Sequence, residues 1–169
     1  MNFLEAVDFI IDLEGGATVV NNPDDPGGLT KFGISKRSYP NLDIVNLTID
    51  QAREIYKKDF WDKVSGDLLP SGLNLLVFDA AINQGEDTAS MALQRIVRAK
   101  ADGNIGTVTL EALQGRSIRE LILLYSLERH RLYTKAKWDK FGAGWSKRLL
   151  IVSLKAGEAA NGPRVNSLT

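Results

Sequence analysis

The chain of 169 residues contains no cysteine and only one histidine, His130. The missing cysteines exclude disulfide bonds and thiolate metal sites. A single histidine does not suffice for a zinc site of the amidase or peptidase kind, and no serine or cysteine motif accompanies it. We therefore interpret His130 as a structural or surface residue and predict neither a metal nor a cofactor.

The chain also lacks net charge, because 21 Lys and Arg balance 21 Asp and Glu. The total therefore gives no support for nucleic-acid binding. The charges are unevenly distributed: the first thirty residues hold six acidic and no basic side chains, whereas Arg116–Lys155 is rich in Arg and Lys. Two interpretations stay open, a basic surface for an anionic polymer such as bacterial cell wall, and an ordinary solvated helical face.

No long apolar run is present either. The stretch Met1–Gly16 carries an apolar helical stripe but lacks the basic start and small-residue cleavage site of a signal peptide. Asp8, Asp12 and Glu14 interrupt the stripe, so the stretch is not expected to span a membrane. We expect no membrane insertion.

Apolar residues recur at helical spacing along most of the chain. Its 169 residues, with 44% hydrophobic content, suffice for one core. The segment Asn21–Gly28 is dense in turn formers, which favours a small hairpin between 18–20 and 29–34. The predicted fold is mainly α (α+β), and a monomer is the default. The helices are expected before Gly15, over 48–64, over 70–84, over 88–99, from 117 to before Gly142, and from 145 toward Gly157.

Glu14 is the strongest candidate for chemistry. It lies at the predicted end of the first helix, where unpaired carbonyls form the negative end of the helix dipole. That field favours the protonated form of a carboxyl group, which is the form that a glycosidase acid needs. The glycines that follow leave the carboxyl accessible to a sugar. A solvated glutamate at a helix end is the alternative.

The turn that follows supplies further polar side chains. Glycosidases pair their acid with a second carboxylate, and Asp24 or Asp25 could provide it. Aspartates also simply stabilise turns by bonding nearby amides. Thr30, after two glycines, could orient a water molecule or be an ordinary strand threonine.

Together these residues resemble a known family. They are similar to the signature of glycoside hydrolase family 108, the N-acetylmuramidases of phage endolysins and bacterial genomes. The matching residues are Glu14-Gly15-Gly16 and then Asn22-Pro23-Asp24-Asp25-Pro26-Gly27-Gly28-Leu29-Thr30-Lys31-Phe32-Gly33-Ile34. The order also resembles the Glu, Asp, Thr triad of phage-type lysozymes. The resemblance implies Glu14 as the acid, Asp24 as the second carboxylate and Thr30 as the hydroxyl. The separation from Glu14 to Asp24 is one residue longer than in that triad, which keeps Asp25 as an alternative.

The resemblance continues through most of the chain. Phe78–Gly85 is similar to the end of the family's central helix. The C-terminal half resembles the predicted peptidoglycan-binding segment that accompanies the family, at Ala92–Arg95, at Asp102–Gly106 and at Gly144-Trp145 with Arg148. We expect one lysozyme-like domain over 1–169, with a catalytic segment 1–88 and a helical peptidoglycan-binding segment 89–169 packed with it.

Four residues are candidates for substrate binding. Asn83 and Gln84 are polar residues at a helix end that could bond sugar hydroxyl or acetamido groups, with C-capping as the alternative. Trp145 is preferred among three tryptophans for stacking on a sugar because glycines precede it, although a tryptophan is usually a core residue. Phe32 belongs to the signature and is the fourth candidate.

The resemblance implies a muramidase that hydrolyses the β-1,4 bond between N-acetylmuramic acid and N-acetylglucosamine in peptidoglycan, as a phage endolysin for host lysis. We expect it to be made in the bacterial host's cytoplasm and to reach the periplasmic wall after release by another factor. A lytic transglycosylase, which also relies on one glutamate, and a non-enzymatic wall-binding module are the alternatives. Asp24 and Thr30 favour water chemistry over the transglycosylase.

Overall fold

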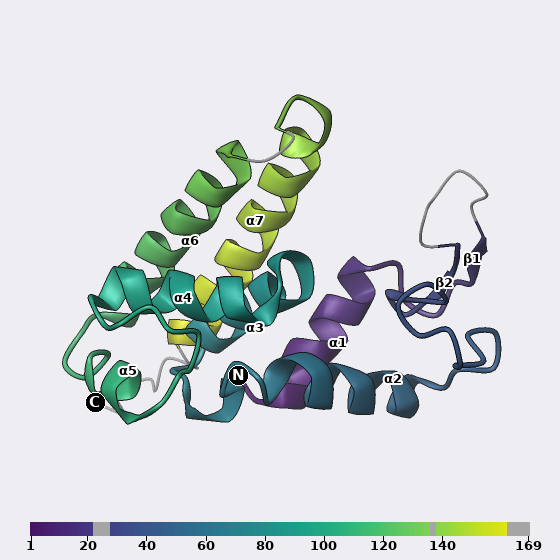
Figure 1. Cartoon of the computed structure of the whole chain (residues 1–169), viewed down its shortest axis with the longest axis horizontal. Coiled ribbons are helices and arrows are strands. Elements are labelled where there is room, and N and C mark those ends of the chain that lie inside the picture. The colour runs from purple at the N-terminus through teal and green to yellow at the C-terminus, as the bar shows by residue number, and fades with distance from the viewer. Residues whose placement is uncertain (22–27, 136–137, 162–169) are drawn as a thin grey trace, which may run out of the picture. The chain divides into compact units, whose positions relative to one another are not determined.

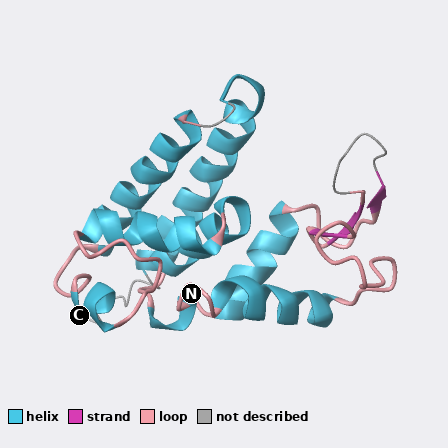
Figure 2. Ribbon diagram, viewed as in Figure 1, coloured by secondary structure: helices cyan, strands magenta, loops and turns pink. Residues whose placement is uncertain are grey.

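A computed structural model describes residues 1–21, 28–135 and 138–161. Helices dominate this part of the chain, and three short strands accompany them (Figures 1 and 2). The chain divides into two compact units, an N-terminal unit of Asn2–Asp59 and a C-terminal unit that runs from Phe60 and includes Met1. The predicted fold class, mainly α with a small β element, is confirmed. The division into functional segments at residue 88 stays a prediction.

The N-terminal unit begins with α1, Phe3–Leu13, and both of its ends follow from local sequence. Asn2 caps the first turn in a capping box with Glu5. At the other end Gly15 and Gly16 have φ of 96° and 63°, and the amide of Gly16 donates to the carbonyl of Ile11. Such left-handed residues are readily supplied by glycine, so the predicted helix end at the double glycine is confirmed.

A three-stranded antiparallel sheet follows, in the order β1 (Val20–Asn21), β2 (Leu29–Lys31) and β3 (Ile34–Ser35). The expected hairpin of the first two strands is confirmed. The run 29–34, expected as one strand, is instead a second hairpin. Phe32 and Gly33 have φ of 53° and 78°, and two successive positive φ values make the tight turn that joins β2 to β3.

Helix α2, Ile49–Tyr56, completes this unit and begins at the predicted capping box of Thr48 and Gln51. Arg53 binds Asp8 of α1 through both carboxylate oxygens, at 2.8 and 2.9 Å, and so ties the two helices together. The expected continuation to residue 64 was wrong. The chain changes to a π-helical turn over Lys57–Trp61, which buries the Trp61 ring against the backbone of Gly66.

The C-terminal unit is built around α3, Leu73–Gln84, whose residues from Leu73 to Ala81 are all buried. It packs against α4 (Glu86–Val97), α6 (Ile118–Thr134) and α7 (Trp138–Asn161), and a short α5 (Thr107–Glu111) lies between α4 and α6 in sequence (Figure 1). The predicted helix end at Gly85 is confirmed. No helix in the described part of the chain is both long enough and apolar enough to cross a membrane.

The prediction that Gly142 and Gly144 break the last helix was wrong. The break between α6 and α7 comes earlier, and α7 then runs through both glycines and through Gly157. Each glycine in a helix costs about 1 kcal/mol relative to alanine. Burial of Val152 and Ala156 on the inner face of α7 offsets such a cost, so tertiary packing overrides the local preference.

Candidate active site

Glu14 is the residue that ends α1. Its backbone has φ −86° and ψ 5°, and its amide donates to the carbonyls of Ile10 and Ile11 at 3.0 and 3.2 Å. The residue is half-buried and lies where the last carbonyls of the helix gather. The position predicted for Glu14, at the negative end of the helix dipole, is therefore confirmed, and its role as the acid stays a prediction.

The side chain of Glu14 packs directly against Gly33 in the turn between β2 and β3. A Cβ atom placed on Gly33 would lie 2.9 Å from Cγ of Glu14 and 2.5 Å from the hydroxyl oxygen of Tyr56. The same turn is held by two hydrogen bonds: the Phe32 amide donates to the Gly16 carbonyl, and the Tyr56 hydroxyl donates to the Phe32 carbonyl, at 3.1 and 3.0 Å. The turn that contacts the Cβ and Cγ atoms of Glu14 is therefore itself held in place by Gly16 and Tyr56.

Replacing Gly33 by alanine is expected to impair both activity and stability. The new methyl group would press on Glu14 and Tyr56 at distances that real contacts avoid, and φ of 78° is itself unfavourable for alanine, by about 1 kcal/mol or more. We expect at least about a tenfold loss of glycan hydrolysis, with thermal unfolding at a lower temperature.

Gly28→Ala is the matched control for Gly33→Ala, because Gly28 has φ of 64° but nothing within 4 Å of its added Cβ. The control carries the backbone strain without the pressure on Glu14. Assays of glycan hydrolysis and thermal melts on both variants separate the two effects. Equal activity losses in both would mean that strain, and not the position of Glu14, accounts for the result.

Thr30 lies at the centre of the sheet, in β2, opposite Val20 of β1 and Ser35 of β3. Its hydroxyl donates to the carbonyl of Gly28 at 3.3 Å and is half-buried. A hydroxyl that donates one hydrogen bond still has lone pairs that accept, so the side chain can hold a water molecule. Its catalytic role stays a prediction.

The other predicted residues of this region are placed differently. Asp24 and Asp25 lie outside the described residues. The ring of Phe32 is only 6% exposed, and Nζ of Lys31 lies 5.3 Å from its centroid. A burial this deep makes Phe32 part of the interior that supports the turn, and sugar contact by its side chain stays a prediction.

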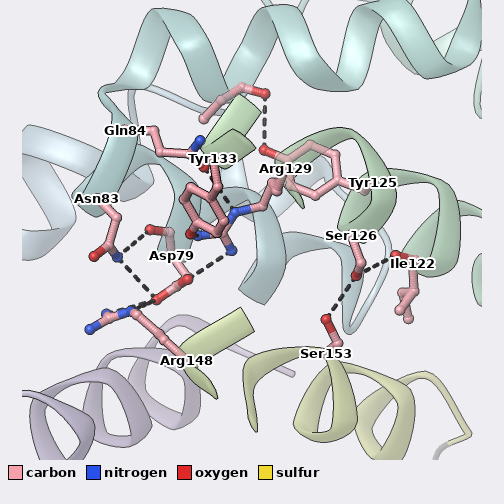
Figure 3. Close-up of polar contacts among 11 residues, drawn as sticks. Asp79, Asn83, Gln84, Ile122, Tyr125, Ser126, Arg129, Tyr133, Arg148 and Ser153 are labelled. Atoms are coloured by element: carbon pink, nitrogen blue, oxygen red, sulfur yellow. Dashed lines mark hydrogen bonds and ion pairs between the residues drawn. The ribbon is translucent and has the colours of Figure 1, made fainter. Parts of the chain in front are cut away.

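Asn83 and Gln84 lie in the C-terminal unit, at the end of α3, and their side chains bond residues of a polar network (Figure 3). The amide nitrogen of Asn83 donates to the backbone carbonyl of Asp79 at 2.8 Å, and the side-chain oxygen of Gln84 accepts from Nε of Arg129 at 3.0 Å. Asn83 is exposed and Gln84 is half-buried. Both side chains thus have structural partners, and their contact with substrate stays a prediction.

The centre of that network is Asp79, which is fully buried. It forms ion pairs with Arg129 and Arg148, each at 2.7 Å, and Nε of Arg148 also donates to its Oδ1 at 2.8 Å. Nη2 of Arg129 donates to the Tyr133 hydroxyl at 2.9 Å. Burial is the largest single effect on the pKa of Arg129 and lowers it, but the charge and hydrogen bond of Asp79, together with Tyr133 and Tyr125, outweigh burial and leave that pKa raised, so the guanidinium keeps its charge.

Trp145 is half-buried in α7 and stacks against two other rings. Its centroid lies 5.3 Å from that of Tyr133 and 5.5 Å from that of Phe141, at interplanar angles near 28° and 29°. Phe141 is the most accessible of these three residues, at 43% exposure, whereas Trp145 is half-buried and Tyr133 is buried. Stacking of Trp145 on a sugar stays a prediction, since the protein already supplies it with ring partners.

The sequence did not predict that the turn at Gly33, held by Tyr56, packs against Glu14. It also did not predict that Asp79, Arg129 and Arg148 form one network. The signature contains Gly33, which was a signal that close approach or a left-handed backbone is needed there. Tyr56 carries no such signal, because its contact with the turn joins residues 24 positions apart.

A mainly helical chain with a small antiparallel sheet after its first helix has a lysozyme-like fold. Residues 7–85 match the family model of glycosyl hydrolase 108. The solved structure of Brucella abortus SagA is 30% identical in sequence, with a TM-score of 0.84 over 95% of this chain and 97% of SagA. No curated protein matches the chain. The chain belongs to glycosyl hydrolase family 108.

Proposed function

We propose that this glycoside hydrolase is an N-acetylmuramidase, which cleaves the β-1,4 bond between N-acetylmuramic acid and N-acetylglucosamine in bacterial peptidoglycan. The observation that carries the proposal is the position of Glu14, which ends α1 and packs against Gly33 of the hairpin turn. Membership of family 108 and the order of Glu14, Asp24 and Thr30 in the sequence support it further.

In the proposed reaction Glu14 is the general acid. Its carboxyl proton passes to the glycosidic oxygen as the bond from that oxygen to the anomeric carbon breaks, and positive charge develops on the sugar ring. The Asp24 carboxylate takes a proton from the attacking water, or it stabilises the charge on the sugar while the Glu14 carboxylate takes that proton. Thr30 holds the water through its hydroxyl oxygen. The water oxygen bonds to the anomeric carbon, and a new reducing end is released.

Analysis of the released muropeptides tests this function. Purified protein is incubated with peptidoglycan, and the products are separated and weighed by mass spectrometry. A muramidase yields reducing N-acetylmuramic acid ends. A lytic transglycosylase would yield anhydro-sugars, each lighter by one water molecule, and a wall-binding module would release nothing. A turbidity assay on permeabilised cells gives the rate.

Asp24→Asn is expected to slow hydrolysis more than Asp25→Asn, by about 100-fold against less than about tenfold. An asparagine at the second carboxylate position neither balances positive charge on the sugar nor accepts a proton from water. The comparison of initial rates decides between the two aspartates, and each variant is the other's control. Equal small losses would mean that both carboxylates are structural and bond turn amides.

The C-terminal unit is proposed to contribute substrate contacts, with the segment 89–169 assisting attachment to the wall. Asn83 is exposed, and its amide nitrogen is engaged by Asp79, so its side-chain oxygen is the atom proposed to accept from a sugar. Gln84 and Trp145 are proposed to contact the same glycan polymer. A role as a phage endolysin in host lysis belongs to this proposal, and lysis of cells that express the protein together with a membrane-permeabilising factor tests it.

A further inference from the structure

An open pocket of about 330 Å³ lies in the N-terminal unit, on the loop that follows β3. It is lined by five consecutive residues, Ser38, Tyr39, Pro40, Asn41 and Leu42. None of them has a part in the reaction proposed above. The volume falls at the lower end of the range typical of small-molecule sites, which is suitable for one sugar residue.

The loop that forms this pocket is held in shape from within its own unit. The Tyr39 amide donates to the Ser35 carbonyl and the Leu42 amide to the Tyr39 carbonyl, both at 3.0 Å, while Nζ of Lys36 donates to the Leu42 carbonyl at 2.8 Å. The Tyr39 hydroxyl donates to Oδ2 of Asp59 at 2.8 Å. Burial first, and then this bond to Asp59, raise the pKa of Tyr39, so the hydroxyl stays protonated and remains the donor.

The pocket is joined to Thr30 through the sheet. Thr30 and Ser35 are directly paired across β2 and β3, and the side chains of such a pair lie on the same face of the sheet. Ser35 in turn bonds Ser38, hydroxyl to hydroxyl at 3.0 Å, and accepts from the Ser38 amide at 3.2 Å. The first residue of the pocket is therefore linked to the candidate catalytic Thr30 through one cross-strand pair and one hydroxyl–hydroxyl bond. A polymer bound at Thr30 can extend to it.

The lining has the chemistry of a site for a neutral sugar. The five residues carry no formal charge. With its hydroxyl bound to Asp59, Tyr39 offers its ring, which together with Pro40 and Leu42 suits the C–H face of a pyranose. Asn41 is exposed, and its amide has both a donor and an acceptor, the pair that matches an acetamido group.

We propose that this pocket is a subsite for an N-acetylglucosamine residue of the glycan, at a position removed from the bond that is cleaved. The inference rests on the proposed function, because it takes the same polymer as substrate. Between the two sugars of peptidoglycan it selects N-acetylglucosamine, because N-acetylmuramic acid carries a lactyl group and its peptide, for which the five lining side chains provide no charged partner, and the neighbouring Lys36 ammonium is bound to the Leu42 carbonyl.

The test measures binding without turnover. The Glu14→Gln variant is titrated with the β-1,4-linked trimer of N-acetylglucosamine while backbone amides are followed by NMR, and with cellotriose, which has the same linkage but no acetamido groups. Asn41→Ala in the same background removes the proposed acetamido partner. Asn46→Ala is the matched control, because Asn46 is an exposed asparagine of the same loop whose amide bonds Asp43, outside the pocket.

We expect the trimer to shift the amides of 38–42, Asn41→Ala to raise the Kd by about three- to tenfold, and Asn46→Ala to change it less than about twofold. Cellotriose is expected to bind more weakly than the trimer. Unchanged affinity in Asn41→Ala, shifts confined to other residues, or no binding of the trimer would overturn the subsite. The wild-type muropeptide assay is independent of these results: if it released no reducing ends, the proposed function would fail while a positive binding result stood.

Discussion

Replacing Glu14 by glutamine is expected to abolish lysis, with a rate at least about 100-fold below wild type. A positioned general acid contributes about 10²–10⁴-fold to a rate, and an amide of the same shape has no acidic proton to give. Because the side chain keeps its size, its packing against Gly33 and the end of α1 should persist. The melting temperature should therefore stay within about 2 °C of wild type.

Asp12→Asn is the matched control for this variant. Asp12 lies two residues earlier on the same helix, is exposed, and loses the same charge on substitution. Initial rates in the turbidity assay should be near wild type for Asp12→Asn and near background for Glu14→Gln. If the glutamine variant retained more than about a tenth of wild-type activity while the fold was intact, another residue would have to supply the proton.

The features predicted correctly from the sequence are those with local causes. The capping box at Thr48 and the two glycines after Glu14 act through hydrogen bonds between residues a few positions apart, so a short stretch of sequence suffices to predict each of them. The position of Glu14 at a helix end follows from the same signals. Its family signature then linked that position to chemistry, which neither the helix nor the composition could do.

The features that were missed depend on contacts between distant segments. Phe32 and Gly33 turn the chain because Glu14 and Tyr56 require the backbone to approach closely, and the spacing of residues in 29–34 does not reveal this. Helix α7 likewise passes through Gly142 and Gly144, since its packing against neighbouring helices outweighs the local cost of glycine.

The basic stretch 116–155 is the clearest case of a surface interpretation that the structure limits. Arg129 is fully buried and Arg148 is half-buried, and both are paired with the buried Asp79 (Figure 3), so their charges are neutralised within the protein rather than presented on a polymer-binding surface. A sequence predicts a charged residue to be exposed unless its partner is known, and Asp79 lies 50 positions before Arg129. The other basic side chains of the stretch remain available to either interpretation.

Asp79→Asn is expected to be the most destabilising substitution in the C-terminal unit. The change leaves the charge of Arg129, at 0% exposure, without its counter-ion, and turns an amide NH₂ toward guanidinium donors. Removal of one partner of a buried ion pair costs about 3–5 kcal/mol in the free energy of unfolding. For a chain of this length that corresponds to a melting temperature about 6–20 °C lower.

Thermal and urea unfolding of three variants tests this expectation. Glu158→Gln is the matched control, because Glu158 pairs with Lys155 at 3.4 Å on the surface and its loss should cost less than about 1 kcal/mol. Arg148→Ala should fall between the two, since Arg148 is 15% exposed and its removal leaves Asp79 paired with Arg129. If Asp79→Asn and Glu158→Gln unfolded alike, the buried ion pairs would contribute no more to stability than a surface pair, and other contacts would have to hold α3, α6 and α7 together.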